Sequence, residues 1–576
     1  MRRRVFLSGA ILTGVGLPML AGCKLPWQSK HQAGSTSAAS TAASASASPS
    51  AVKTPGTAAP TASAAPQGWQ ELDAHVMGHH LGIQVSPLVH RDEKTTVLAL
   101  RLTRAKDDPA VKDIANSSKD PGNNTFEATS PLGRPIHIRT FDWGATGVRL
   151  LDLSTNRVWV ATTGVENKVK DNYNKLALKP GESTSCFVLF GPVDAKQVTV
   201  LVPQAGFVTV DVVDKDAPAA SGVDFAAMDK AFDSVATIGY SRDKAKPEQA
   251  LEAPVTIERF ARALDDSSNT HTGSKDITVT LASDVTFASD SAELASGAEA
   301  QLQTVAGKLG QYPDGGTLTI VGHTDDVQDD AYNQTLSEKR ANTVKTRLEQ
   351  LTSLDKWHTS VSGKGESEPK IKGTTDEARA ANRRVEIILT PTSGTTPKNT
   401  APSAGTGSLP ETKGAVAKGA EGVTVKNDSG NGELTITLDH VTRSGGYLLG
   451  QLHTTLSTKN NSTTGLFHWF KDKEVFLSNV RGEDASGETT GFSADGLTLL
   501  AGGERIYPAD YLDAEFKTHV PLTELALTPF IKAGTTTICV VWPDPGGDTI
   551  TVDHTAPMKQ LSDFAYRLTD IPVKNS

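Results

Sequence analysis

Two segments of this sequence consist almost entirely of Ser, Ala, Thr, Pro and Gly, and they constrain its fold more than any other feature. The first runs from residue 34 to about 66, and the second from about 393 to 418. Such segments have too little apolar surface to offset the entropy lost when a chain becomes ordered. We therefore predict linkers at 24–68 and 392–418, with separately folding regions between and beyond them.

Length and charge narrow the possibilities further. The chain has 576 residues, too many for one hydrophobic core, so we expect three or four domains. Its formal net charge is −9, and no basic run follows residue 4. Because phosphate binding requires clustered Lys and Arg, nucleic acid is not expected as a partner.

The N-terminus reads as an export signal. Residues 2–4 are arginine, an apolar run follows over 5–21, and the run ends in Leu-Ala-Gly-Cys at Cys23. This pattern resembles a bacterial lipobox, which implies a signal peptide at 1–23 and attachment of lipid, such as palmitate, to Cys23. The alternative is an ordinary secretory signal with a chance cysteine. Sec and twin-arginine export both stay open.

Two regions, 69–216 and 419–560, contain short alternating apolar runs separated by turn residues. We predict an all-β, immunoglobulin-like sandwich for each. In both regions a Leu-Ala-Leu sequence precedes a glycine, and a cysteine follows that glycine five residues later, at Cys186 and Cys539. We infer that the second region repeats the first. The cysteines should then occupy equivalent strand positions, as two buried side chains rather than a disulfide.

A connecting segment at 217–275 leads to a region with a different pattern, 276–391. The periodicity predicts strands at 277–281, 318–321 and 384–389, and helices containing residues 298–309 and 336–351. A third helix should open at a capping box, Thr374-Thr375-Asp376-Glu377. The expected fold is α/β, with helices packed over one sheet. We assign residues 561–576 to a C-terminal tail.

Several ordered motifs in this region point to a known family. They are Gly322-His323-Thr324-Asp325, Asn333, Arg340, Gly363-Lys364-Gly365-Glu366 and Asn382-Arg383-Arg384. Over about a fifth of the chain, the sequence resembles the OmpA C-terminal family, which includes peptidoglycan-associated lipoproteins and flagellar stator proteins. The resemblance implies non-catalytic binding of peptidoglycan at the free end of diaminopimelate in the stem peptide, where an ammonium and a carboxylate share one carbon.

The same resemblance implies roles for individual residues. Asp325 would accept hydrogen bonds from the ammonium, and Arg340 would grip the carboxylate with its planar guanidinium. Asn333 would order the intervening loop and touch the ligand. Of Arg383 and Arg384, one would bind and one would pack, and we carry Arg383 forward as the binding residue. A salt bridge between Asp325 and Arg340 that merely closes the loop is the alternative.

Neighbouring positions qualify this reading. His323 is expected to be a structural residue behind the loop. Many family members have glycine where this chain has Gln328, and Asp329 and Asp330 are inserted after it, so the loop over the ligand should be more acidic than usual.

No catalytic motif accompanies this site in the sequence. A Gly-x-Ser-x-Gly elbow, a His-Glu-x-x-His pair, a phosphate-binding loop and a Cys-x-x-Cys pair are all absent. His75, His79 and His80 cluster, but we do not expect a metal there, nor any cofactor. We therefore predict a non-enzymatic protein of the cell envelope, anchored to the membrane by lipid and bound to peptidoglycan, whose sandwiches contact other envelope proteins. The alternative is a receptor or adhesin whose sandwiches bind a separate ligand, with the OmpA-like domain as an anchor only.

Overall fold

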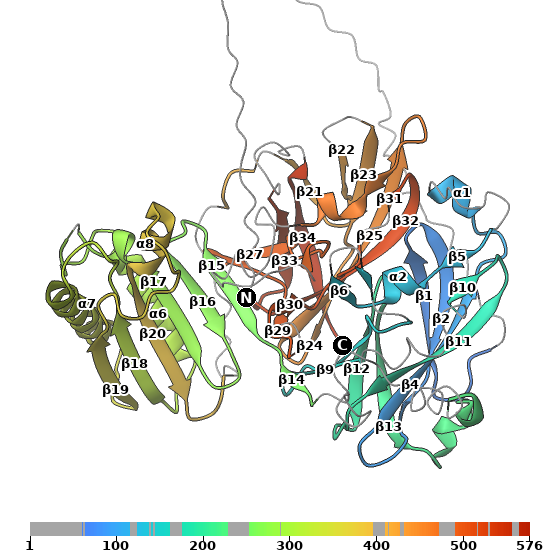
Figure 1. Ribbon diagram of the computed structural model, residues 1–576, viewed down its shortest axis with the longest axis horizontal. Helices are drawn as coiled ribbons and strands as arrows, with labels where there is room; N and C mark the ends of the chain where they lie inside the picture. Colours follow the sequence, from blue (N-terminus) through green and yellow to red (C-terminus); the bar gives the residue numbers. More distant parts are fainter. Residues whose placement is uncertain are drawn as a thin grey trace, which may run out of the picture. The chain divides into compact units, whose positions relative to one another are not determined.

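The computed structural model describes residues 60, 64–115, 124–137, 140–141, 144–161, 176–228, 253–288, 290–395, 409–412, 414–426, 431–471, 490–514, 517–527, 530–555 and 564–576. These residues fall within one compact unit, Ala58–Ser576. The predicted signal peptide with Cys23, most of both linkers and part of the connecting segment lie outside the described residues. Where it is described, the chain is mostly β, with few helices (Figure 1).

The N-terminal β unit (residues 69–214) is built on a sheet of ten strands that includes one strand from the connecting segment. Its strands are β1 (Gln70–Val76), β2 (His79–Val85), β3 (Leu88–His90), β4 (Thr96–Arg104), β8 (Arg149–Asp152), β9 (Arg157–Val160), β11 (Ser183–Phe190), β12 (Gln197–Val202), β13 (Gly206–Asp214) and β14 (Val255–Thr256). The strand order is β1-β2-β4-β3-β13-β12-β8-β9-β14, and β11 also pairs with β4. Alternate side chains from both halves of this sheet meet in one core, as Leu100, Val188, Leu150 and Val200 do.

Short elements complete this unit. They are α1 (Val111–Ile114), α2 (Thr129–Leu132) and two small sheets, β5 (Phe126–Glu127) with β10 (Ala177–Leu178) and β6 (Pro135–His137) with β7 (Thr140–Phe141).

The C-terminal β unit (residues 415–575) has its own set of strands. They are β21 (Ala415–Lys418), β22 (Val423–Lys426), β23 (Gly432–Thr437), β24 (Val441–Ser444), β25 (Tyr447–Thr458), β27 (Thr498–Ala501), β28 (Glu504–Ile506), β32 (Ala533–Pro543), β33 (Thr549–His554) and β34 (Tyr566–Asn575). Two smaller pairs accompany them, β26 (Thr464–Gly465) with β31 (Phe530–Ile531) and β29 (Asp510–Leu512) with β30 (His519–Pro521).

The two β units share one strand order. In the C-terminal unit the order is β22-β23-β25-β24-β34-β33-β27-β28, which corresponds strand by strand to the run from β1 to β9. The extra strand also corresponds, because β32 pairs with β25 as β11 pairs with β4. In both units one corresponding pair is parallel, β13 with β3 and β34 with β24, and the C-terminal unit has a second parallel pair, β21 with β34. This agreement supports the predicted duplication; the immunoglobulin-like topology stays a prediction.

The two cysteines do not occupy equivalent positions, which corrects the sequence alignment by one residue. Cys186 lies in the interior core of the N-terminal unit, whereas Cys539 belongs to a different buried cluster. When the paired strands of the two units are aligned by their registers, Val188 of β11 corresponds to Val540 of β32. Two residues earlier, Cys186 therefore corresponds to Ile538 and not to Cys539. Since side chains alternate along a strand, a shift of one residue turns the side chain to the opposite face. Both cysteines are buried and free, as predicted, but only Cys186 lies in the core of its own unit.

The cluster that contains Cys539 joins the two β units. It combines Leu151, Val158 and Leu201 of the N-terminal unit with residues such as Tyr511 and Val541 of the C-terminal unit, all nearly inaccessible to solvent. Polar contacts cross the same boundary. The Gln204 amide donates to Glu524 Oε1 at 2.8 Å, Arg149 Nε donates to the Tyr511 hydroxyl at 2.9 Å, and the Tyr447 hydroxyl donates to Asn156 Oδ1 at 2.7 Å.

The α/β unit (residues 277–391) has helices packed on one sheet, as predicted. Its elements are β17 (Ile277–Ala282), α5 (Ser283–Thr286), α6 (Ala298–Gly310), β18 (Gly316–Gly322), α7 (Asp330–Leu351), β19 (Trp357–Gly363), α8 (Asp376–Asn382) and β20 (Arg384–Pro391). The sheet order is β19-β18-β20-β17, in which only β18 and β19 are parallel. Leu302 and Val305 of α6 and Val344 and Leu348 of α7 pack against Ile320 and its neighbours on the strands.

The last part of the predicted connecting segment, 217–275, forms strands. β15 (Arg259–Ala263) and β16 (Ser268–Thr272) form a hairpin, which we call the connecting hairpin. On one side β16 pairs with β17 of the α/β unit, and on the other β15 pairs with β28 of the C-terminal β unit. Just before it, β14 pairs with β9 of the N-terminal β unit.

Three further expectations are wrong. Residues 566–575, assigned to a tail, form β34 and pair with β33, β24 and β21. Residues 415–418, assigned to a linker, form β21. The third helix does open near residue 375, but its N-cap is Thr375, whose hydroxyl accepts from the Ala378 amide at 3.2 Å. Since position N3 is then alanine, the reciprocal capping box cannot form.

Candidate functional site

A pocket of about 460 Å³ lies at one end of the α/β sheet, beside the first half of α7. Its lining is Ser283, Asp284, Phe287, Ala288, Asp290, Thr324, Asp325, Val327, Gln328, Tyr332, Asn333, Leu336, Arg340 and Arg383. All four predicted binding residues of the α/β unit, Asp325, Asn333, Arg340 and Arg383, are therefore brought to one cavity. Two apolar side chains at its border are exposed, Val327 by 60% and Tyr332 by 41%.

Two glycines bring α7 close enough to the sheet to reach this pocket. Gly322 and Gly363 lie opposite each other at the ends of β18 and β19. A Cβ atom on Gly322 would lie 2.1 Å from the Ser337 carbonyl oxygen, and one on Gly363 would lie 2.5 Å from the Glu338 amide nitrogen. Side chains at these positions would push the helix away, so glycine is required for close backbone approach.

Arg383 bridges two carboxylates on one wall of the pocket. Its Nε and Nη2 donate to the two oxygens of Asp284 at 2.7 and 2.6 Å, and its Nη1 donates to Asp325 Oδ2 at 2.7 Å. Hydrogen bonding by Arg383 lowers the pKa of the Asp284 carboxyl, and the two carboxylates raise the pKa of Arg383 in return. The Asp325–Arg340 salt bridge considered as an alternative is not formed, because Asp325 pairs with Arg383 instead.

Arg340 is placed differently from Arg383. Its Nε donates to the Ser291 carbonyl at 2.9 Å, and its guanidinium stacks over the Phe287 ring at 5.2 Å. Within the described part of the chain, the two terminal nitrogens have no hydrogen-bond partner and no carboxylate pairs with this arginine. Burial lowers the pKa of Arg340, opposed by the nearby charges of Asp284, Asp290 and Asp325. Nε and the face of the guanidinium therefore hold this side chain in place at the pocket, and its terminal nitrogens stay available for a ligand.

Asn333 holds the loop that carries Asp325. Its Nδ2 donates to the carbonyls of Asp325 and Gln328 at 3.2 and 3.0 Å and to Glu366 Oε2 at 2.7 Å. The inserted Asp329 is the N-cap of α7, and its side chain accepts from the Tyr332 amide at 2.9 Å. The inserted acids therefore contribute to the start of the helix and do not line the cavity.

A comparison with protein-family models matches residues 286–383 to the OmpA family. The putative lipoprotein YfiB of Escherichia coli (strain K12) is 33% identical over 113 residues, which are 19% of this chain and 68% of YfiB. The chain belongs to the OmpA family. The match is confined to the α/β unit, which we now call the OmpA domain, and leaves out both β units.

Other relatives match a similar share of the chain. Outer membrane porin F of Pseudomonas aeruginosa is 42% identical over 103 residues, which are 18% of this chain and 29% of the porin, so the chain spans less than a third of that relative. A solved structure, the cell wall anchor of the T6SS from Pseudomonas aeruginosa, is 26% identical and covers 22% of this chain and 90% of that one. Its TM-score of 0.20 is too low to bear on the fold.

The structure separates Arg383 from Arg384, which the sequence could not do. Arg384 is buried, and its Nε donates to Glu386 at 2.7 Å, outside the pocket. His323 is also buried, as predicted, and lies near Glu386 at 3.8 Å without lining the cavity. Burial, together with the charge of Arg384, lowers the pKa of His323 to about 4, so this ring is neutral at pH 7.

Sequence reasoning missed Asp284, the carboxylate that Arg383 holds with two hydrogen bonds. Its one signal in the sequence is position, because this charged residue lies two residues after the end of the alternating apolar run of β17. Sequence reasoning also gave no role to Phe287, whose ring supports Arg340.

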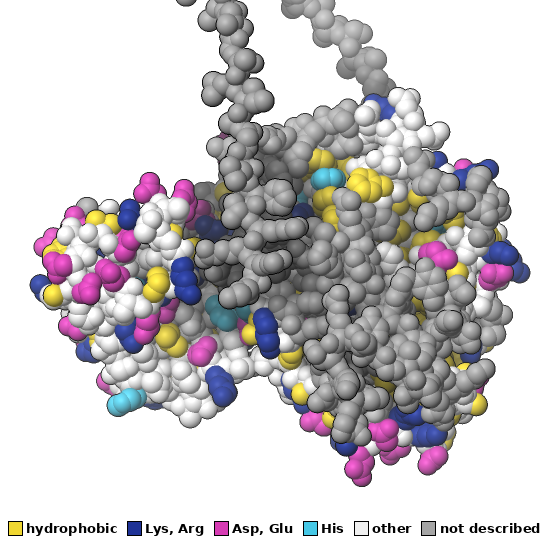
Figure 2. Space-filling model, viewed as in Figure 1, with side chains coloured by type: hydrophobic (Ala, Val, Ile, Leu, Met, Phe, Trp, Pro, Cys, Tyr) yellow, Lys and Arg dark blue, Asp and Glu magenta, His cyan; other side chains and the backbone are white. Residues whose placement is uncertain are grey.

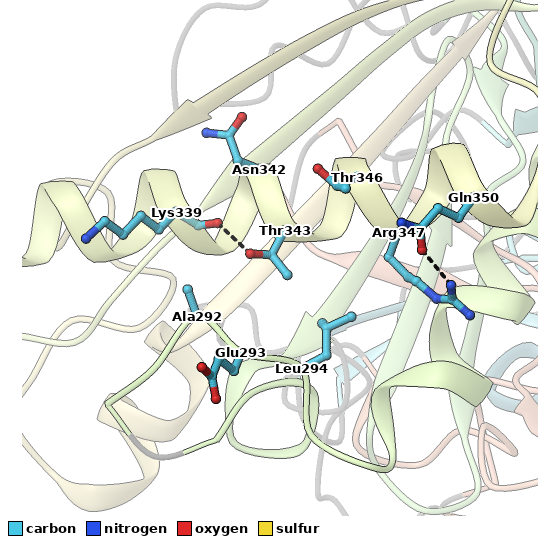
Figure 3. A pocket seen from close by; sticks show the side chains of 9 residues that line it. All are labelled: Ala292, Glu293, Leu294, Lys339, Asn342, Thr343, Thr346, Arg347 and Gln350. Carbon is cyan, nitrogen blue, oxygen red and sulfur yellow. Dashed lines mark hydrogen bonds between the residues drawn. The ribbon is translucent and has the colours of Figure 1, made fainter.

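A second and larger hollow of about 630 Å³ lies along the outer side of α7 (Figure 3). Lys339, Thr343 and Arg347 of the helix line one side of it, and Glu293 and Leu294 of the loop before α6 line the other (Figure 3). Arg347 is paired with Glu299 at 2.6 Å. None of the predicted site residues lines this hollow.

The surface of the OmpA domain carries charges of both signs. Figure 2 shows carboxylates and cationic side chains interspersed over the end of the domain that bears α7 and α8. In the parts of the chain that are described, the helices are all too short or too polar to cross a membrane.

Proposed function

We propose that this protein binds peptidoglycan without catalysis, through the pocket of its OmpA domain, and links a lipid-anchored envelope protein to the cell wall. The observation that carries the proposal is that Arg340, whose terminal nitrogens have no hydrogen-bond partner among the described residues, lines the same pocket as the carboxylates of Asp325 and Asp284. A site that holds a cation and carboxylates in one pocket suits a ligand bearing both charges.

The free end of diaminopimelate is such a ligand. Arg340 would receive its carboxylate through two parallel hydrogen bonds, as the planar guanidinium allows. Asp325 would accept from the ammonium through Oδ1, which has only a long contact of 3.4 Å with the Val327 amide, while Oδ2 stays with Arg383. In this proposal Arg383 is a positioning residue that holds the two carboxylates, rather than a direct ligand contact. The exposed Val327 and Tyr332 would cover the aliphatic part of the stem.

The expected affinity is modest. Each charge-assisted hydrogen bond contributes roughly 1.5–3 kcal/mol. A few of them, set against the cost of association, give dissociation constants on the order of micromolar to millimolar. Attachment to the membrane would keep the domain close to a wall that presents many stems, so effective concentration would supply much of the binding.

The membrane link rests on the sequence around Cys23, which lies outside the described residues. Its Leu-Ala-Gly-Cys pattern supports lipid attachment, and two relatives from Escherichia coli carry the names "Putative lipoprotein YfiB" and "Probable lipoprotein YiaD". The linker at 24–68 would span roughly 35–40 Å on average and about 150 Å when extended. That reach would allow the folded part to leave the membrane surface.

Co-sedimentation with purified peptidoglycan that contains diaminopimelate tests the proposal. We expect the protein beginning at residue 24 to pellet with the wall. The variants Asp325→Asn and Arg340→Gln should bind roughly 10- to 100-fold more weakly, which corresponds to the loss of one charge-assisted contact.

The chain offers matched controls for both substitutions. Asp326→Asn changes the adjacent carboxylate, which pairs with Arg379, and Arg347→Gln changes an arginine two turns further along α7. Both control variants should bind like the unchanged protein. If Asp325→Asn and Arg340→Gln bound as well as these controls, the pocket would not be the binding site. If the unchanged protein failed to pellet, the wall-binding proposal itself would be wrong.

A further inference from the structure

Three potential metal ligands converge where the connecting hairpin meets the C-terminal β unit. They are Glu258, His271 and His519, and one ligand atom from each lies within 4.8 Å of the others. His271 Nε2 and His519 Nε2 both approach the same oxygen, Glu258 Oε2, at 2.6 and 2.9 Å. Among the described residues this is the one such group of three. The clustered His75, His79 and His80 do not belong to it.

Backbone pairing holds the three residues in place. Glu258 exchanges two backbone hydrogen bonds with Asp510 of β29, which is the strand that pairs with β30, where His519 lies. His271 stands opposite Phe260 in the connecting hairpin, so it lies diagonally across from Glu258 on the same face. The side chain of His519 is 8% exposed, that of Glu258 16% and that of His271 34%.

We propose that Glu258, His271 and His519 form a binding site for a divalent transition-metal ion, with Zn²⁺ the best match. Two imidazoles and one carboxylate are a ligand set that zinc accepts, with a fourth position left for water. Ligand atoms around a tetrahedral ion at zinc distances are roughly 3.3 Å apart. Small side-chain rotations would therefore be enough to admit the ion.

The charge of the site suits a cation. The Glu258 carboxylate supplies the negative charge, and each imidazole already directs its Nε2 atom toward Glu258 Oε2. When the metal binds, each histidine must present the lone pair of Nε2, so its proton moves to Nδ1 or is released to solvent.

The site would have a structural consequence. Glu258 and His271 belong to the segment that leads into the OmpA domain through β16 and β17, whereas His519 belongs to the C-terminal β unit. A bound ion would fasten the segment that leads into the wall-binding domain to the C-terminal β unit. This inference concerns a different part of the molecule from the proposed peptidoglycan site, and it holds whether or not that proposal does.

Titration of the untagged, metal-stripped protein with Zn²⁺, followed calorimetrically, tests the site. We expect one equivalent to bind, and His519→Gln and His271→Gln each to weaken binding by more than about tenfold. His358→Gln is the matched control, because it changes an exposed histidine on β19. Circular dichroism shows whether each variant is folded, and His271, the more exposed ligand, provides the second test if His519→Gln unfolds.

Two further results complete the experiment. Co²⁺ in place of Zn²⁺ should give the visible absorption of a four-coordinate site, and this absorption should be lost in His271→Gln and kept in His358→Gln. The proposal is overturned if the protein shows no saturable binding near one equivalent, or if folded His271→Gln and His519→Gln bind as tightly as His358→Gln. The three residues would then be a hydrogen-bonded group only.

Discussion

Arg383 and Arg384 show how much the role of a residue depends on the direction in which its side chain points. They are adjacent in sequence, yet Arg383 faces the pocket and clamps Asp284 and Asp325, while Arg384 is buried against Glu386. Arg383 is the C-cap residue that follows α8, and Arg384 begins β20, so successive side chains leave the backbone in different directions. To decide which arginine of such a pair can bind a ligand, one must therefore know where the helix ends and the strand begins.

Glu524 gives a prediction at the same scale. It is buried between the two β units, and burial raises its pKa to about 7 despite hydrogen bonds from the amides of Cys539 and Gln204. A carboxyl whose pKa is raised by folding stabilises the folded state at pH values below its unfolded-state pKa of about 4.5. This contribution is lost as the pH rises from about 4.5 to about 7. The change amounts to about 3 kcal/mol. We expect Glu524→Gln to remove this part of the pH dependence.

Urea unfolding followed by tryptophan fluorescence between pH 5 and 8 measures this effect. As the pH rises, the unfolding free energy of the unchanged protein should fall relative to that of the Glu524→Gln variant. Glu421→Gln alters an exposed acid of the same unit and should leave the pH profile unchanged. Parallel profiles for the Glu524→Gln variant and the unchanged protein would show that Glu524 titrates normally.

At the scale of elements, the contact between α7 and the strand ends depends on Gly322 and Gly363. We expect Gly363→Ala to destabilise the OmpA domain by about 1–3 kcal/mol, because the added methyl overlaps backbone and side-chain atoms of Ser337 and Glu338. The displaced helix would also misplace Arg340 and weaken wall binding. Chemical denaturation and co-sedimentation measure the two effects.

The same domain contains a glycine for which the opposite result is expected. Gly307 lies on the exposed side of α6, and a Cβ there would meet nothing within 4 Å. Gly307→Ala should therefore stabilise the domain by about 0.5–1 kcal/mol through helix propensity alone. If both glycine variants destabilised the domain equally, close approach of α7 would not be the reason for glycine at 363.

Elements with regular apolar periodicity were predictable from sequence, and others were not. The helices α6 and α7 and the strands β17, β18 and β20 follow their patterns closely. The strand β19 reads Trp-His-Thr-Ser-Val-Ser-Gly, and as an edge strand with mostly polar side chains it gave no apolar signal. Strand β34 escaped detection because it contains Pro572 and ends in polar residues.

The pocket was predictable to the same partial degree. Asp325, Asn333, Arg340 and Arg383 could be selected because they sit in ordered motifs, and all four line one cavity. Asp284 and the Glu258–His271–His519 group belong to no motif. Such groups arise from strand pairings between residues far apart in the sequence, and a single sequence does not show them.

At the scale of the whole molecule, the buried cluster between the β units makes them energetically dependent on each other. We expect calorimetry to show one unfolding transition for both β units, because neither can unfold without exposing Val541, Leu201 and their neighbours. Val541→Ala should lower the midpoint of that transition. Leu348→Ala, in the separate core of the OmpA domain, should destabilise that domain by about 2–5 kcal/mol instead. Two separate β transitions would contradict this coupling.

The strands β14 and β15 have a consequence for any attempt to divide this chain into fragments. Each pairs with the edge strand of a β unit, β14 with β9 and β15 with β28. In each unit the short strand forms hydrogen bonds with backbone amides and carbonyls that would otherwise be exposed at the edge of the sheet. Unprotected edges pair readily with other chains. A fragment cut before residue 253, or one that begins after 263, would expose such an edge and should self-associate, so the boundaries read from composition are poor places to cut.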